Sequence, residues 1–321
     1  MNSPLLGIHH VTAIASDPQA NINFYAGLLG LRLVKKTVNF DDPSAYHLYY
    51  GDDTGSPGTI LTFFYWPQGG GRGRVGPGQM TRLSFSIPSD ARDFWRGRLE
   101  RHGVSTTLES RSIGSEEPEE SLIFRDPDGI TVELVVAEHD ERHGRDALGV
   151  PAAMAIRGFH TAELTVRAVG ATEALLLGEM GYRQVAHQGN RSRFEVGAGG
   201  PGTYIDVVAD AETRPGLGGV GTIHHVAWNV ADDAGEALMH RRLTGAGLNV
   251  SPVMDRNYFR SIYYREPGGI LFEIATTVPG FAVDEPSERL GRDLKLPAQY
   301  EHARPEISRL LPPLADARTY A

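Results

Sequence analysis

The chain has 321 residues, of which 40% are hydrophobic and 22% charged, as in ordinary globular proteins with room for two domains or several smaller units. A net charge of −9 spread along the chain argues against a nucleic-acid partner, and the absence of cysteine excludes disulfides, thiolate metal sites and a cysteine nucleophile. The N-terminus shows no signal-peptide pattern and the longest apolar run is too short to cross a membrane, so we expect a cytoplasmic protein without a membrane partner.

Four segments of the chain resemble one another, and each begins with a run that has the alternating, β-branched character of a strand. The four runs are GIHHVTAI from Gly7, MTRLSFSI from Met80, RGFHTAEL from Arg157 and TIHHVAWN from Thr222. We take Ile8, Thr81, Gly158 and Ile223 as equivalent positions. This alignment places four residues in register with one another, namely His10, Leu83, His160 and His225.

After each of these strands the sequence predicts one helix and then three further strands. Polar breaks suited to a helix N-terminus precede three of these helices. The first is expected to end near Gly30, and the other two to span residues 91–103 and 234–247. Each segment closes with two strand-like runs around a Gly/Pro turn. We therefore predict an α+β fold of four βαβββ modules that pair into two curved mixed-sheet half-barrels. The modules span residues 1–67, 80–140, 156–210 and 221–277, and a tail at 278–321 wraps the surface.

The linker at residues 68–79 contains a G-x-G-x-x-G pattern that we do not interpret as a phosphate site. A strand rather than a helix is predicted to follow it, so no helix N-terminus is available to bind a phosphate.

Two histidine doublets, His9-His10 and His224-His225, mark the opening strands of the first and fourth modules. Along a regular strand the two rings of a doublet face opposite sides, unless a bulge intervenes. A single histidine is more often a hydrogen-bonded core or surface residue, but doublets at equivalent points of related modules favour a site. Glu273 lies in the otherwise apolar run ILFEIAT, where a carboxylate is costly unless it is paired or bound to metal. Two imidazoles and one carboxylate form the facial triad of non-haem Fe(II) oxygenases, and Mn(II) fits the same ligands.

The run from Tyr263 to Glu273, YYREPGGILFE, resembles the signature of extradiol ring-cleavage dioxygenases. Together with GIHHVT and TIHHVAW, it makes the whole chain similar to the hydroquinone-cleaving branch of the vicinal oxygen chelate (glyoxalase/extradiol dioxygenase) superfamily. The resemblance implies that modules one and four pair around the metal and that modules two and three form the second half. It also implies that Fe(II) binds to His10, His225 and Glu273.

The same resemblance places five further residues around the substrate, namely His9, Thr12, His224, Arg256 and Tyr263. Tyr263 could donate a hydrogen bond to an oxygen of the reactants, and Arg256 could stabilise a phenolate. His9 or His224 could move protons near neutral pH. Without the resemblance, we would interpret Arg256 as a member of a surface ion pair and Tyr263 as an aromatic residue of the core.

A rival ligand set consists of His160, His225 and Glu273, because catechol-cleaving relatives build the site from modules three and four. We prefer His10, since the doublets mark modules one and four. Glu133 of module two sits where Glu273 sits in module four, but Leu83 stands at the histidine position. We interpret His160 and Glu133 as the remnant of a second site.

The predicted function is a dioxygenase that inserts both atoms of O₂ into a para-dihydroxylated ring, with a small aromatic substrate and O₂ as its partners. A catechol-cleaving extradiol enzyme is the first alternative. A glyoxalase-like lyase or isomerase is the second, but it would need a further carboxylate ligand where module one offers only Thr62 or Phe63. A bleomycin-sequestering binding protein would be shorter and lack the triad. The sequence leaves open whether the chain forms a homo-oligomer.

Overall fold

The computed structural model describes residues 3–66, 70–113, 118–147 and 149–320. The first module contains β1 (Leu5–Ala15), α1 (Pro18–Ile22), a π-helical turn (Asn23–Leu28), β2 (Arg32–Val38), β3 (Tyr46–Gly51) and β4 (Ile60–Tyr65). The second contains β5 (Gln79–Ile87), α2 (Arg92–Arg101), β6 (Thr107–Arg111), β7 (Glu119–Arg125) and β8 (Thr131–Val136). The third contains β9 (Gly158–Val166), α3 (Gly170–Gly178), β10 (Arg183–Gln188), β11 (Arg191–Glu195) and β12 (Tyr204–Ala209). The fourth contains β13 (Thr222–Val230), α4 (Asp233–Gly245), β14 (Met254–Asp255), β15 (Phe259–Arg265) and β16 (Leu271–Pro279).

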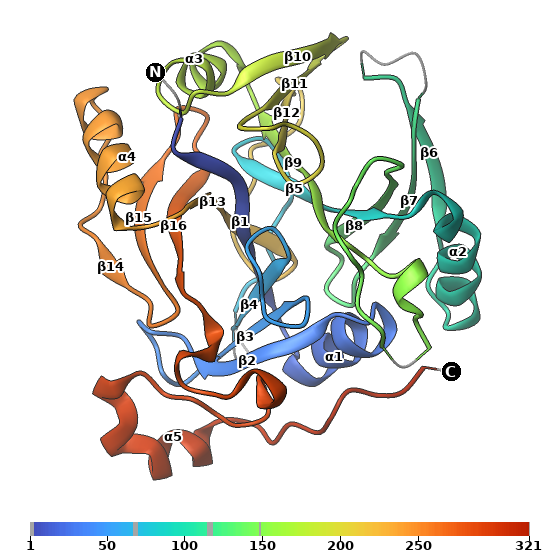
Figure 1. Cartoon of the computed structure of the whole chain (residues 1–321), viewed down its shortest axis with the longest axis vertical. Helices are drawn as coiled ribbons and strands as arrows, with labels where there is room; N and C mark the ends of the chain where they lie inside the picture. The colour runs from blue at the N-terminus through green and yellow to red at the C-terminus, as the bar shows by residue number, and fades with distance from the viewer. Residues whose placement is uncertain (1–2, 67–69, 114–117, 148, 321) are drawn as a thin grey trace.

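These strands form two curved sheets of eight strands each (Figure 1). The first sheet has the order β14-β15-β16-β13-β1-β4-β3-β2, and the second has the order β10-β11-β12-β9-β5-β8-β7-β6. Antiparallel pairs join the two modules at the centre of each sheet, β1 with β13 and β5 with β9. Each module therefore contributes one strand, one helix and three strands, which confirms the predicted fold class.

Local sequence explains where two of the helices, α1 and α4, begin. The Asp17 side chain accepts hydrogen bonds from the backbone N–H groups of Gln19 and Ala20, and Pro18 follows it at the first helical position. Asp232 caps α4 in the same way. The first helix differs from the prediction, because its second half winds as a π-helix, in which the N–H of Leu29 bonds to the carbonyl of Phe24.

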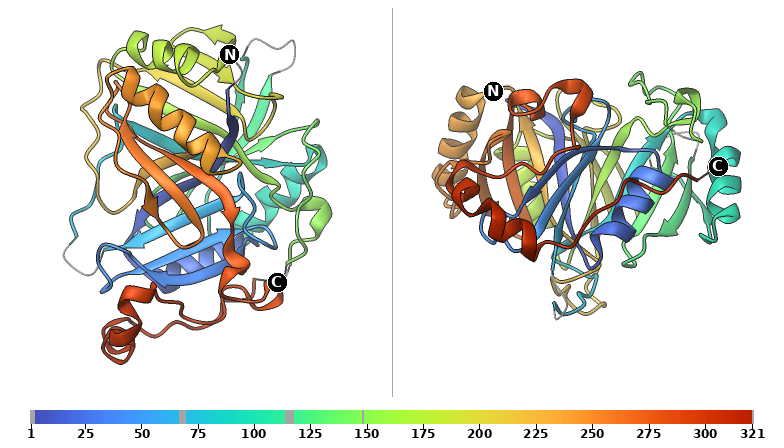
Figure 2. Two further views of the ribbon diagram at one scale, coloured as in Figure 1. Left: turned by 60° about the vertical axis from the view of Figure 1, so that its left-hand side comes forward. Right: turned by 90° about the horizontal axis from the view of Figure 1, so that it is seen from below.

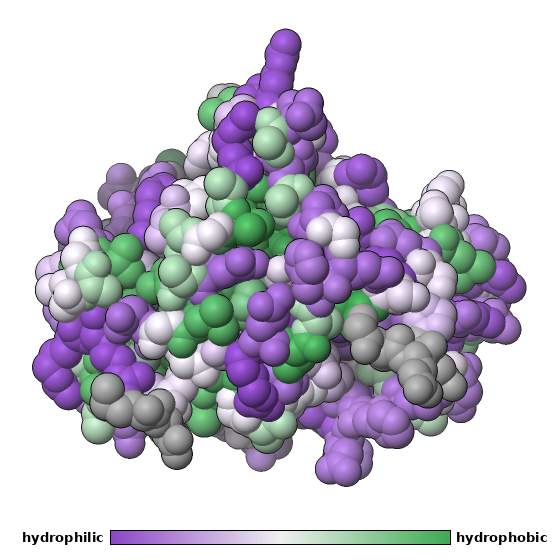
Figure 3. Space-filling model, turned by 90° about the horizontal axis from the view of Figure 1, so that it is seen from above, coloured by the Kyte–Doolittle hydropathy of each residue, from purple (hydrophilic) through white to green (hydrophobic). Residues whose placement is uncertain are grey.

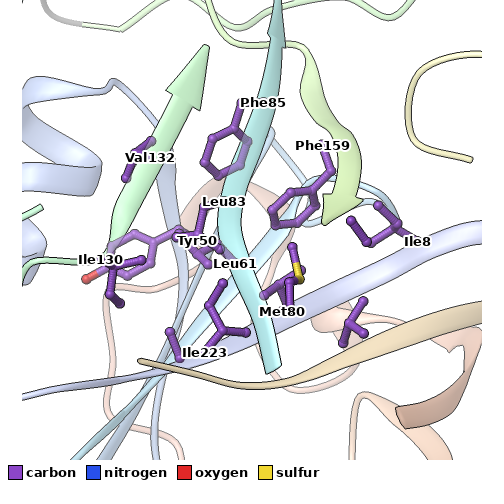
Figure 4. Packing of buried hydrophobic residues seen from close by; sticks show 14 of the residues in the cluster. Ile8, Tyr50, Leu61, Met80, Leu83, Phe85, Ile130, Val132, Phe159 and Ile223 are labelled. Atoms are coloured by element: carbon purple, nitrogen blue, oxygen red, sulfur yellow. The ribbon is translucent and has the colours of Figure 1, made fainter. Parts of the chain in front are cut away.

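The two sheets bury their apolar faces against each other (Figure 4). Phe85 of β5 and Phe159 of β9 stack with their ring centroids 4.8 Å apart. Tyr50 and Leu61 from the first sheet lie beside Leu83 from the second (Figure 4). This shared core leaves the opposite, concave face of each sheet free for polar side chains.

The C-terminal segment, residues 280–320, runs along β2 and α1 at the outer end of the first sheet (Figures 1 and 2). The hydroxyl of Tyr46 donates to the carbonyl of Pro312 at 2.9 Å, and the backbone N–H of Ala315 donates to Gln19 at 2.7 Å. A side chain at Gly27 would clash with the carbonyl of Arg318, since its Cβ would lie 2.4 Å away. The segment also contains the short helix α5 (Arg304–Leu310).

Hydrophobic residues occur in small groups among hydrophilic ones on the face shown in Figure 3. None of the helices in the described ranges has both the length and the apolar character needed to span a bilayer.

Candidate metal centre

Each histidine doublet lies at a β-bulge between β1 and β13. The pairing of these strands shifts by one residue at His9 and again at His224, so the first histidine of each doublet is the extra residue of a bulge. A bulge redirects the side chains beside it and is common near active sites. As a result, His10 and His225 both point into the concave face of the first sheet, and each is accompanied by its doublet partner.

His10, His225 and Glu273 meet at the centre of this face. The Nε2 atom of His225 lies 3.0 Å from Oε2 of Glu273, and Nε2 of His10 lies 3.2 Å from the same oxygen. The two Nε2 atoms are 3.3 Å apart. All three side chains are buried, and within the described ranges they form the one cluster of three His, Asp or Glu groups whose ligand atoms converge.

The geometry of the cluster fits a metal ion. Ligand atoms about 2.1 Å from an ion and at right angles to one another lie about 3 Å apart, which matches the three separations. Oε2 of Glu273 is buried and lacks a hydrogen-bond partner among the described residues, whereas Oε1 accepts the hydroxyl of Ser261. Burial alone raises the pKa of Glu273, but His10 and His225, when protonated, hold it well below its ordinary value. A cation bound in place of those protons would have the same effect, with Oε2 of Glu273 as one of its ligands.

Hydrogen bonds around His9 determine which nitrogen of His10 is free. Nε2 of His9 lies 3.1 Å from the carbonyl oxygen of Thr276, which can only accept, so this nitrogen carries the proton. Burial and the neighbouring His10 lower the pKa of His9 to about 3, so the ring is neutral and its Nδ1 is an acceptor. Nδ1 of His10 donates to it at 2.9 Å, which leaves Nε2 of His10 with a lone pair directed at the cluster.

The second doublet repeats this contact, with Nδ1 of His224 and Nδ1 of His225 2.7 Å apart. Burial and His225 lower the pKa of His224 to about 3 as well. Both values lie far from the neutral range in which we expected these two rings to move protons. The arrangement instead suits side chains that orient metal ligands.

A cavity of about 200 Å³ opens directly beside the cluster. Of the residues predicted to surround the substrate, Thr12, His224, Arg256 and Tyr263 line it, whereas His9 lies behind His10. The Nε of Arg256 donates to the hydroxyl of Tyr263 at 3.2 Å. Cavities for drug-sized ligands measure roughly 300–1,000 Å³, so this one suits a small molecule such as a single aromatic ring.

Eight further lining residues were not predicted from the sequence. Three are Asn39, Asp41 and Leu271, three are the aromatic residues Phe40, Phe64 and Phe259, and the other two are His47 and Tyr49 of β3. The module repeat contained a signal for the last pair, because YHLYYG in module one corresponds to FRSIYYR in module four, which carries Tyr263. The tail does not contribute to the lining, which comes from residues 10–64 and 224–273.

Relatives of known name cover nearly the whole chain. It is 45% identical over 313 residues to the Bacillus subtilis protein named "Putative ring-cleaving dioxygenase MhqO", with 98% of each chain covered. It is 33% identical over 311 residues to the chlorohydroquinone/hydroquinone 1,2-dioxygenase of Sphingobium indicum, with 95% of each covered. The chain belongs to the ring-cleaving dioxygenase family.

A family model described as the Glyoxalase/Bleomycin resistance protein/Dioxygenase superfamily matches residues 7–134 of this dioxygenase. A crystal structure titled as a putative dioxygenase from Bacillus subtilis superimposes with a TM-score of 0.93 at 44% identity, covering 99% of this chain and 100% of the other. Glyoxalase I from Zea mays shares the fold alone, with a TM-score of 0.61 at 13% identity, covering 84% and 92%. The vicinal oxygen chelate fold expected from the sequence is thus shown.

The second sheet of the dioxygenase corrects the alignment of the modules. In the first sheet His10 pairs with Ala227 and Thr12 with His225, and in the second Arg82 pairs with Glu163 and Ser84 with Thr161. The counterparts of the two histidines are therefore Arg82 and Thr161, not Leu83 and His160. A shift of one residue turns a side chain to the other face, so Leu83 belongs to the core.

The rival ligand set is not assembled. His160 lies in the second sheet, with its Nδ1 2.7 Å from the hydroxyl of Thr161 and its Nε2 3.7 Å from Glu119. In place of a metal cluster, the guanidinium of Arg82 lies 3.1 Å from both Glu109 and Glu163 and 3.6 Å from Glu133. Arginine occupies the centre of this face, and Arg111 and Ser121 also bind Glu133.

The first sheet also identifies the counterpart of Glu273 in module one. Thr12 pairs with Thr62, as Ala227 pairs with Glu273, so Thr62 stands at the carboxylate position, and the alternative, Phe63, is buried in the core. Within the described ranges, the cluster consequently offers three side chains to a metal ion, without the further carboxylate expected of a glyoxalase-like lyase.

Proposed function

We propose that this ring-cleaving dioxygenase depends on Fe(II), is of the extradiol type and inserts both atoms of O₂ into a hydroquinone-type ring. The observation that carries the proposal is the convergence of His10, His225 and Glu273 beside a small, aromatic-walled cavity. Two imidazoles and a carboxylate are the ligand set of non-haem Fe(II) oxygenases, and Mn(II) is the alternative ion. The name of the Sphingobium relative supports a hydroquinone substrate.

When bound, the Fe(II) ion would supply adjacent coordination positions for the two reactants and a path for electrons between them. The protein's part is to orient the ring and to exclude stray water. Burial raises the pKa of Tyr263, so its phenol stays protonated and can donate a hydrogen bond to a reactant oxygen. The positive charge of Arg256, held against Tyr263, favours a phenolate in the cavity.

The alternative function is cleavage of catechols, because the same cluster could bind a ring through two neighbouring hydroxyls. The partners we propose are therefore a small aromatic substrate and O₂. The cytoplasm is the proposed location, because its reducing conditions favour the ferrous ion.

The test is O₂ uptake by protein loaded anaerobically with Fe(II) or, separately, with Mn(II). Uptake in proportion to added chlorohydroquinone, with the ring-opened product carrying two labelled atoms from ¹⁸O₂, would support the proposal. Greater turnover of catechol would favour the catechol-cleaving alternative. No uptake with either ring would overturn the dioxygenase proposal for these substrates, and a His225→Ala variant provides the metal-free baseline.

A further inference from the structure

The two modules of the first sheet place a second tyrosine opposite Tyr263. In β15 and β16, Tyr263 pairs with Glu273, and in β3 and β4, Tyr49 pairs with Thr62. Since Thr62 is the counterpart of Glu273, Tyr49 is the counterpart of Tyr263. The sheet order β15-β16-β13-β1-β4-β3 sets the two tyrosines on opposite walls of the cavity, with the ligand-bearing strands β13 and β1 between them.

A row of hydrogen bonds fixes Tyr49 in place. Its hydroxyl lies 2.9 Å from Nδ1 of His47, and Nε2 of His47 lies 2.7 Å from the hydroxyl of Thr62. Thr62 in turn lies 3.1 Å from the hydroxyl of Thr12. Tyr49, His47 and Thr12 all line the cavity, so the row begins and ends at the substrate space.

Aromatic contacts hold the rings of this row. His47 packs against Tyr49 and Phe64, with centroids 4.1 and 4.4 Å away. Behind Tyr49 lies Phe281 of the C-terminal segment, 5.2 Å from it between centroids. The tail therefore supports this wall from behind although it does not line the cavity.

The hydroxyl of Tyr49 has hydrogen-bonding capacity that none of the described residues uses. Both nitrogens of His47 are engaged, so the imidazole orients Tyr49 and Thr62 and has no nitrogen left for a substrate. The contact with His47 is the hydroxyl's one hydrogen bond within the described part of the chain. A phenol can both donate and accept a hydrogen bond. If Tyr49 donates to His47 it can still accept a hydrogen bond from a molecule in the cavity, and if it accepts from His47 it can still donate one. Buried polar groups normally find such a partner.

We propose that Tyr49, oriented by His47, binds the substrate hydroxyl that is not at the metal, and thereby selects para-dihydroxylated rings. The proposal rests on the proposed function. A ring anchored through one hydroxyl at the ligand cluster directs a para-hydroxyl away from the metal, whereas an ortho-hydroxyl stays beside it. On the β15 wall Tyr263 accepts from Arg256 and keeps its O–H for a reactant oxygen, as proposed above, and on the opposite β3 wall Tyr49 offers a second hydroxyl.

The experiment compares two ligands that differ at the distal position, hydroquinone and 4-methylphenol, by calorimetric titration of the Fe(II)-loaded protein without O₂. Tyr49→Phe removes only the hydroxyl. It should weaken hydroquinone binding about 3- to 10-fold, as expected for one hydrogen bond, and leave 4-methylphenol unchanged. Tyr50→Phe is the matched control, because Tyr50 follows on the same strand, belongs to the buried core and is not among the residues that line the cavity.

His47→Gln tests the positioning role. It should reproduce the selective loss, and the double variant with Tyr49→Phe should bind hydroquinone no more weakly than Tyr49→Phe alone. An equal loss for both ligands, or no loss for either, would overturn the assignment of Tyr49. If the unaltered protein binds 4-methylphenol but neither binds nor cleaves hydroquinone, the proposed substrate class itself is wrong.

Discussion

The Nδ1 atoms of His9 and His10 lie 2.9 Å apart, although the two residues follow each other in one strand. In a regular strand their rings would lie on opposite faces of the sheet. The bulge at His9 brings them together, and the carbonyl of Thr276 fixes the proton on the far nitrogen of His9. His9 thus determines that the free lone pair of His10 is the one that faces Glu273.

His9→Phe keeps a planar ring in this position but removes the acceptor for His10. Partners that orient metal ligands typically contribute about 10- to 100-fold in affinity, and we expect a loss of that size for Fe(II). Competition with a chelator under anaerobic conditions measures it. The exposed His139 provides a control, His139→Phe, which should have no effect. Unchanged affinity in His9→Phe would show that the bond is dispensable.

Removal of the ligands themselves distinguishes the two proposed clusters. His10→Ala and Glu273→Ala should each abolish stoichiometric iron binding, because two ligand atoms do not hold the ion in the cavity. His160→Ala should retain iron, since this residue lies in the second sheet, 3.7 Å from Glu119. Metal analysis after anaerobic loading and desalting gives the result. Iron retained in His10→Ala and lost in His160→Ala would establish the rival set.

The sequence was sufficient for the fold class, and it singled out His10, His225 and Glu273, which the structure brings together, because doublets and closing strands recur at module spacing. It was not sufficient for the second sheet, where Arg82 rather than Leu83 matches His10. The reason is physical: a bulge inserts one residue without a distinctive sequence pattern, and one residue exchanges the two faces of a strand. The contribution of His47 and Tyr49 in β3 to the cavity could have been predicted by aligning Tyr49 with Tyr263 in the module repeat.

The second sheet gives a prediction about stability. Arg82→Met leaves Glu109, Glu133 and Glu163 without the guanidinium that lies among them. Breaking such a largely buried network costs about 3 kcal/mol, and urea unfolding should show a loss of that order with iron binding retained. Arg96→Met on the exposed face of α2 is the control. A stability equal to that of the control would mean that the network contributes nothing.

Asp126 makes stability depend on pH. Its carboxylate accepts the hydroxyl of Tyr25 at 3.0 Å, and burial raises its pKa to about 6. The folded protein therefore keeps a proton on Asp126 that the unfolded chain loses near pH 4. The contribution of Asp126 to the free energy of unfolding is complete below about pH 4 and is lost as the pH rises through about 6. Between pH 5 and 7.5 the unaltered protein should lose about 1 kcal/mol more than Asp126→Asn in urea unfolding. Parallel pH profiles would contradict this account.

Lys35 attaches the C-terminal segment to the first sheet. It is fully buried, and its Nζ lies 2.5 Å from both Asp284 and Glu285. Lys35→Met leaves the buried Glu285 unpaired, so we expect a loss of about 3 kcal/mol and faster proteolytic release of residues 280–320. Lys36→Met, the same change at the neighbouring residue, should leave the cleavage rate unaltered. Equal rates in the two variants would show that other contacts hold the segment.

The pairing of β1 with β13 also sets the order of events during synthesis. β1 leaves the ribosome first, and its central partner follows only after the whole second sheet, β5 to β12, has been made. Chains fold as they emerge, so the second sheet can close while β1, which pairs with β4 on one edge, still waits for β13 on the other. Glu273 emerges later still. Iron can therefore enter its site only after the fourth module has been made, and a nascent or truncated chain that lacks β13 carries an open edge on β1 in place of a metal centre.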